Sequence, residues 1–168
     1  MTVNPAAQAA QLFASAFGAV VTGTAKTLPA STAGHLFTVA GGRVIVTSMT
    51  AVVSTVVQAQ ACTVSIGNTP TGGSGAAASI ASASGSVSGL AAGASFYVPA
   101  FSSGSPAALA FSGASGVIVG NGVQAELGGI CLVPAGTIDW NTSATNTGAV
   151  TWSISYVPYD AGATITAL

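Results

Sequence analysis

Hydrophobic and polar residues alternate most regularly near the C-terminal end of the chain, in the stretch GTIDWNTSATNTGAVTWSISYVP. Ile138 and Trp140 fall on one face of a first extended segment, and Trp152, Ile154 and Tyr156 fall on one face of a second. Polar residues occupy most positions of the opposite faces. The pattern predicts two strands joined by the loop TSATNTG into a hairpin, with one face buried and the other against solvent or a neighbouring subunit.

Turn signals recur about every ten residues along the rest of the chain, which is the spacing of an all-β sandwich or barrel. The run HLFTVA (35–40) is followed by Gly41-Gly42, and this dipeptide between two apolar runs predicts a tight hairpin. The β-branched stretch 44–67 predicts two successive strands buried on both faces, either in a packed sandwich or at a subunit interface. The Gly-, Ser- and Ala-rich segment 67–93 is expected to form a long surface loop with one weak edge strand.

Further short strands are expected in SFYVPAF (95–101), AALAFSG (107–113) and the stretch GVIVGNGVQAELGGICLVPAG. Beyond residue 25 no segment has a helical period, and roughly ten strands can be counted. Closing such strands into two sheets gives a jelly roll. The sequence therefore predicts an all-β, jelly-roll-like β-sandwich over residues 26–168.

The N-terminal residues 1–25 are predicted to form an arm or short helix that begins at Asn4 and Pro5. A secretory signal is the alternative, but the first positive side chain is Lys26 and glutamines interrupt the apolar run. On the side of the arm that docks on a neighbour we expect three apolar residues. They are Leu12, Phe13 and Phe17.

The scarcity of charge restricts the possible partners. Only 3% of the residues are Asp, Glu, Lys or Arg, whereas an ordinary soluble domain carries about 25%. A net charge of −1 provides neither a basic stripe for nucleic acid nor a polybasic patch for anionic lipid. Mean hydropathy is +0.72, yet Ser, Thr and Gln interrupt the most apolar stretch, so a membrane span is not expected. Such an uncharged surface associates readily with other surfaces.

Titratable groups are too few to predict an active site. A Ser-His-Asp set could be assembled from His35 with Asp139 or Asp160, but the many serines make such a set uninformative. A glycosidase-like carboxylate pair would have to come from Glu126, Asp139 and Asp160, and this is the weaker alternative. Glu126 and Asp139 are expected instead to form isolated ion pairs with Lys26 or Arg43, or to cap loops. No metal-ligand spacing and no phosphate-binding motif occurs. We therefore predict no catalytic residues, no cofactor and no metal.

Cysteine and tryptophan positions support structural interpretations. Cys62 and Cys131 lie in separate predicted strands, and two free buried thiols are favoured over a disulfide. Trp140 and Trp152 face each other across the predicted hairpin, where a core pair or a subunit interface is favoured over a sugar-stacking platform. Trp140, Trp152 and Tyr156 are accordingly the predicted interface residues of the sandwich.

The C-terminal 36 residues, VPAGTIDWNTSATNTGAVTWSISYVPYDAGATITAL, resemble the ending of small β-rich virion proteins of tailed bacteriophages. In that family a segment P-A-G-T-I-x-x-x-T-S-A-T-N-T-G-A leads into a strand and then into Y-x-P-x-x-D-G-A. More loosely, the resemblance includes residues 35–67. This chain departs from the pattern by reading Asp160-Ala161-Gly162 in place of Asp-Gly, and by its low charge.

The resemblance implies a non-enzymatic capsid decoration or cement protein, made in the bacterial cytoplasm and located on the capsid surface. Its expected partners are the major capsid protein and copies of itself, in a homo-oligomer that is expected to be a trimer. Two other roles stay open. One is a phage tail or fibre component, and the other is a secreted lectin-like or ice-binding module.

Overall fold

The computed structural model describes residues 18–29, 33–71, 78–98, 110–112 and 131–168. Within these ranges the chain forms twelve β-strands and no helix. The strands make two sheets, of seven and five strands, and every strand pairing is antiparallel. The predicted all-β sandwich is confirmed, and the jelly-roll order stays a prediction.

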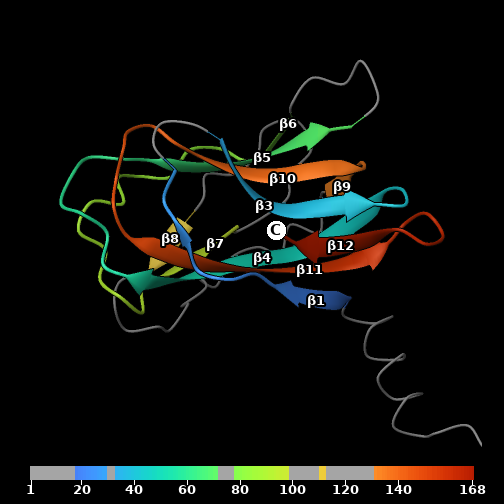
Figure 1. Ribbon diagram of the computed structural model, residues 1–168, viewed down its shortest axis with the longest axis horizontal. Helices are drawn as coiled ribbons and strands as arrows, with labels where there is room; N and C mark the ends of the chain where they lie inside the picture. Colours follow the sequence, from blue (N-terminus) through green and yellow to red (C-terminus); the bar gives the residue numbers. More distant parts are fainter. Residues whose placement is uncertain (1–17, 30–32, 72–77, 99–109, 113–130) are drawn as a thin grey trace, which may run out of the picture.

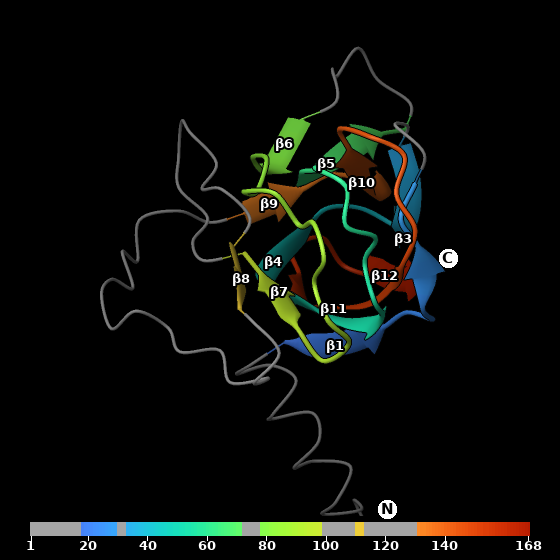
Figure 2. The same ribbon diagram turned by 90° about the vertical axis from the view of Figure 1, so that its left-hand side faces the viewer.

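The seven-stranded sheet has the order β1-β11-β4-β7-β8, with β2 also pairing with β11 and β9 also pairing with β4. Its strands are β1 (Ala19–Thr22), β2 (Lys26–Thr27), β4 (Val44–Thr55), β7 (Ser95–Tyr97), β8 (Ala110–Ser112), β9 (Cys131–Val133) and β11 (Ala149–Pro158). Figures 1 and 2 show β1, β4 and β11 as one layer of the molecule.

The five-stranded sheet has the order β12-β3-β10-β5-β6 and forms the other layer (Figure 1). Its strands are β3 (Ala33–Ala40), β5 (Val64–Pro70), β6 (Ala78–Ala81), β10 (Gly136–Thr142) and β12 (Thr164–Ala167). The weak edge strand predicted within residues 67–93 is β6, so this prediction is confirmed.

The core lies between the sheets and is built by alternation along the strands. On β11 the side chains of Val150, Trp152, Ile154 and Tyr156 are buried, whereas the residues between them are partly exposed. Each large apolar side chain removed from water in this way contributes about 1.5–3 kcal/mol. Alternation therefore places Trp152 and Tyr156 inside the molecule.

The predicted hairpin of residues 136–158 is wrong, because β10 and β11 belong to different sheets. The connection between them crosses from one sheet to the other and is held by Asn146, which is buried. Asn146 accepts a hydrogen bond from the Gln58 backbone N–H at 3.1 Å, and its amide donates to the Gln60 carbonyl at 3.3 Å. Gly148 completes the crossing at φ 111°, where a Cβ would lie 2.9 Å from Val57 Cα.

The hairpin predicted at Gly41-Gly42 is wrong for the same reason. The two glycines do form a tight turn, with φ values of 74° and 138°, but β3 and β4 then enter different sheets. Backbone of the 159–163 connection packs against the turn, since a Cβ on Gly41 would lie 2.4 Å from the Gly162 carbonyl oxygen. Two glycines allow this close approach of loops as well as a hairpin, so the dipeptide alone does not decide between them.

The stretch 44–67 does contain two strands, β4 and the start of β5, but within the single chain only one face of β4 is buried. Burial of both faces by the sandwich itself is therefore wrong, and burial of the outer face at a subunit interface stays a prediction. Burial on β4 alternates, with Met49, Ala51 and Val53 inside and Val52 49% exposed on the other face. The valine content of β4 therefore supplies an outer surface as well as the core.

The N-terminal boundary also differs from the prediction. β1 lies within residues 1–25, which were assigned to the arm, and pairs with β11 from Ala19↔Tyr156 to Thr22↔Ser153. Leu12, Phe13 and Phe17 lie outside the described residues. Removing residues 1–25 would thus remove an edge strand of the sandwich together with the arm.

Both cysteines are free thiols, as predicted. Cys62 is buried in the connection between β4 and β5 rather than in a strand, and Cys131 begins β9. Burial raises the pKa of the Cys131 thiol to about 11 from its ordinary value of 9.0, because a buried thiolate loses its hydration.

We expect iodoacetamide at about pH 8 to alkylate Cys131 about 100-fold more slowly than an ordinary thiol, because the thiolate is the reacting species and its fraction falls tenfold per pKa unit. Peptide mass spectrometry of timed samples measures the rate separately for Cys62 and Cys131. The same reaction in urea is the control and should proceed at the ordinary rate. Equal rates in native and unfolded protein would contradict the burial of Cys131.

Candidate functional site

The outer face of the seven-stranded sheet carries no charged residue at its described positions. Strand register puts Thr151 beside Val52, Ser153 beside Thr50 and Ser155 beside Ser48. All of these lie on the side opposite to the buried residues of β11. We call this surface the uncharged face, and it comprises Val20, Thr22, Ile45, Ser48, Thr50, Val52, Leu132, Thr151, Ser153 and Ser155.

Apolar side chains on the uncharged face are well exposed to solvent. Val20 on β1 is 67% exposed, Val52 on β4 is 49% exposed and Leu132 on β9 is 41% exposed. Between them lie short hydroxyl side chains, of which Thr22 and Ser153 share a hydrogen bond of 2.9 Å. A face with exposed valine and leucine among hydroxyls, and without charge, suits close contact with another protein surface.

The ion pairs of the described residues lie elsewhere. Arg43 and Asp160 form an exposed ion pair of 2.7 Å between the β3–β4 turn and the loop after β11. The Arg43 guanidinium also lies 4.6 Å from the centre of the Tyr159 ring. Hydrogen bonds from Arg43 lower the pKa of Asp160 to about 2, so this pair stays charged until the pH falls towards that value. The predicted partner of Arg43 was Asp139 or Glu126, and the structure corrects this to Asp160.

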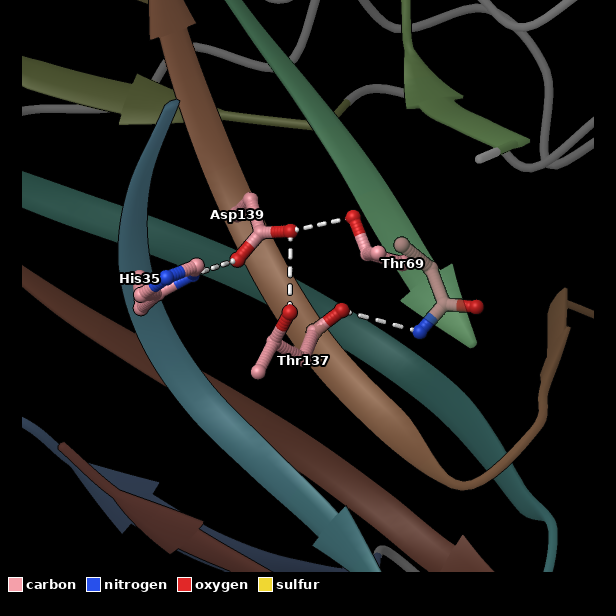
Figure 3. Close-up of polar contacts among 5 residues, drawn as sticks. His35, Thr69, Thr137 and Asp139 are labelled. Carbon is pink, nitrogen blue, oxygen red and sulfur yellow. Dashed lines mark hydrogen bonds and ion pairs between the residues drawn. The ribbon is translucent and has the colours of Figure 1, made fainter. Parts of the chain in front are cut away.

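A polar cluster occupies the outer face of the five-stranded sheet, around Asp139 (Figure 3). Oδ1 of Asp139 lies 2.6 Å from Nδ1 of His35 on β3. Oδ2 accepts hydrogen bonds from the hydroxyls of Thr69 on β5, at 2.7 Å, and of Thr137 on β10, at 3.0 Å. The cluster thus joins three adjacent strands.

Asp139 is buried, with a side chain 5% exposed, while the His35 side chain that covers it is 61% exposed. The alternation in the sequence correctly places Asp139 on the polar face of its strand, but it predicts that the side chain is exposed to solvent. A register shift in the β10–β3 pairing explains the difference, since Asp139 is opposite His35 and Ile138 is opposite Phe37, so that Leu36 is skipped. This bulge brings the imidazole over the carboxylate.

The cluster fixes the tautomer of His35. A carboxylate that receives two hydroxyl hydrogen bonds on Oδ2 acts as an acceptor, so the imidazole Nδ1–H donates to Oδ1. The second ring nitrogen, Nε2, is then an acceptor in the neutral ring. His35 and Asp139 form a pair like the His-Asp pair of a hydrolase.

The predicted interface residues of the sandwich belong to the core of a single chain. Trp140, Trp152 and Tyr156 are 1%, 2% and 7% exposed, so they offer almost no surface to a neighbouring molecule. For Trp140 and Trp152 the structure supports a core pair, rather than a subunit interface or a sugar-stacking platform. The two rings meet between the sheets, with centres 5.9 Å apart and ring planes at 79° to each other. The hydroxyl face of β11, which the sequence assigns to solvent or a neighbouring subunit, forms part of the uncharged face. What the sequence did not reveal is that exposed Val20, Val52 and Leu132 of other strands lie on the same surface.

Among the described residues no group of three potential metal ligands occurs, and none of the described segments is a helix able to cross a membrane. No protein-family model matches the chain, and neither the curated proteins nor the solved structures contain a significant match to it.

Proposed function

We propose that this protein is a structural component of a bacteriophage virion, a capsid decoration protein that binds the outside of the major capsid shell and stabilises it. The observation that carries the proposal is the uncharged face, with its exposed Val20, Val52 and Leu132 among serines and threonines. The C-terminal resemblance to small phage virion proteins gives the setting.

A decoration protein works by summing many weak contacts over a repeated lattice. Uncharged strand positions serve this purpose, because burying a hydroxyl or a methyl group costs far less than burying an ion without a partner. The same face, on a molecule that carries little net charge, favours self-association, which fits the proposed homo-oligomer. In this mechanism the uncharged face contacts the shell or a sister copy, and the arm preceding β1 adds a second contact.

Replacing Val52 with lysine should weaken binding to capsid shells that lack this protein by at least about tenfold, since an unpaired ammonium would enter the contact. Cosedimentation of purified protein with such shells measures the change. Thr166→Lys is the matched control, because Thr166 is exposed on β12 of the other sheet. If both variants bind as the parent chain does, the uncharged face is not the docking surface.

The same experiment separates the proposal from a tail or fibre role. If the protein is a tail component, neither the parent chain nor either variant should bind the shells. Immunogold labelling of intact phage should then find the protein on the tail. Shell binding by the parent chain that is lost in Val52→Lys alone is the result expected for a decoration protein.

A further inference from the structure

A hollow of about 200 Å³ lies on the five-stranded sheet, on the opposite side of the sandwich from the uncharged face. It opens where Gly67 contributes no side chain to the surface of β5. The lining residues come from β5, β6 and β10 and are Ser65, Ile66, Gly67, Ala78, Ser79 and Asn141. These groups are neutral, and three of them carry hydroxyl or carboxamide side chains.

The hollow and His35 flank the same aspartate. Strand register places Asp139 of β10 opposite Gly67 on one side and opposite His35 on the other. His35 and Gly67 are therefore two inter-strand spacings apart, or roughly 10 Å between backbones. A ligand of two sugar rings spans that distance, and a single ring reaches only one of the two places.

The chemistry of this surface selects a neutral ligand. The Asp139 carboxylate is held by His35, Thr69 and Thr137, so it is not free to bind a cation, and its charge disfavours an anion nearby. What remains for a ligand is the Nε2 atom of His35, together with side chains that can both donate and accept hydrogen bonds. Hydroxyls and carboxamides of this kind match the hydroxyl groups of sugars.

We propose that the hollow at Gly67, together with Nε2 of His35, is a binding site for a neutral saccharide of at least two rings. Ser65, Ser79 and Asn141 hydrogen-bond one ring, and Ala78 supplies the apolar part of the contact. His35, held in one tautomer by Asp139, accepts a hydroxyl hydrogen bond from the next ring. This inference stands on the five-stranded sheet alone and does not rest on the virion role.

The test is an NMR titration of the full chain with maltose, lactose and N,N′-diacetylchitobiose as probes, and with glycerol as the control polyol. We expect at least one disaccharide to cause saturable shifts of the backbone amides of Ser65, Gly67 and Ser79 in the millimolar range, and glycerol to cause none. Absence of saturable shifts with all three disaccharides would overturn the proposal, and so would shifts confined to other surfaces.

Two variants test the contributions of the hollow and of His35 separately. Ser79→Leu places a bulky side chain in the hollow from an exposed position on β6 and should abolish the shifts. His35→Asn retains a donor to Asp139 but lacks Nε2, so affinity should fall about fivefold, as expected for one hydrogen bond. Ser48→Leu on the uncharged face is the matched control and should bind like the parent chain. Binding that survives Ser79→Leu would refute the site, whatever the outcome of the capsid experiment.

Discussion

Replacing Trp152 with alanine is expected to lower the free energy of unfolding by about 3–5 kcal/mol, the usual range for a large aromatic side chain deleted from a core. Trp152 is 2% exposed and lies between the two sheets. Its ring stacks on Phe96 with centres 5.9 Å apart, and it meets the edge of Trp140 at the same distance. Because small domains are stable by only about 5–15 kcal/mol, this loss is a large part of the total.

Urea denaturation followed by circular dichroism measures the effect as a lower midpoint with an unchanged slope. Trp152→Phe keeps most of the apolar contact and removes the indole N–H, which is buried without a recorded partner, so it should cost much less. Tyr159→Ala removes an aromatic ring that is 55% exposed and should have only a small effect. Equal losses from Trp152→Ala and Tyr159→Ala would contradict the placement of Trp152 in the core.

Alternation along the chain predicts correctly which side chains face inward, but not which strands pair. On β11 every second residue is buried because the period of a strand is two, and this property is local. Pairing is not local, since β10 and β11 are consecutive in sequence yet enter different sheets. The crossing depends on Asn146 bonding to backbone near residue 60, a contact between segments more than eighty residues apart.

The same limit applies to the two surfaces of interest. Ser153 and Ser155 can be assigned to the outer face of β11 from their spacing alone, whereas Val20 and Val52 cannot, because a valine in a strand is usually buried. Burial of Asp139 arises from side chains on two neighbouring strands and from the bulge opposite it. A polar position in an alternating pattern predicts the direction of a side chain, but not the neighbours that cover it.

Asp139→Ala is expected to destabilise the fold by about 2–4 kcal/mol, because three donors lose a buried acceptor at once. Asp139→Asn should cost less than half as much. Its carboxamide oxygen can still accept from Thr69 and Thr137, and its N–H can donate to Nδ1 of His35. That last hydrogen bond requires the imidazole proton to move from Nδ1 to Nε2.

The two variants therefore differ in a property beyond stability. Nitrogen-15 chemical shifts of the imidazole should report the Nδ1–H tautomer in the parent chain and the Nε2–H tautomer in Asp139→Asn, measured where His35 is neutral. Asp160→Ala is the control for loss of a carboxylate, and it should destabilise the fold much less because its ion pair with Arg43 is exposed. A negligible loss in Asp139→Ala, or an unchanged tautomer in Asp139→Asn, would show that the carboxylate does not orient His35. The orientation of Nε2 beside the hollow would then not be fixed, because the hydrogen bond at Nδ1 is the contact that holds the imidazole to Asp139.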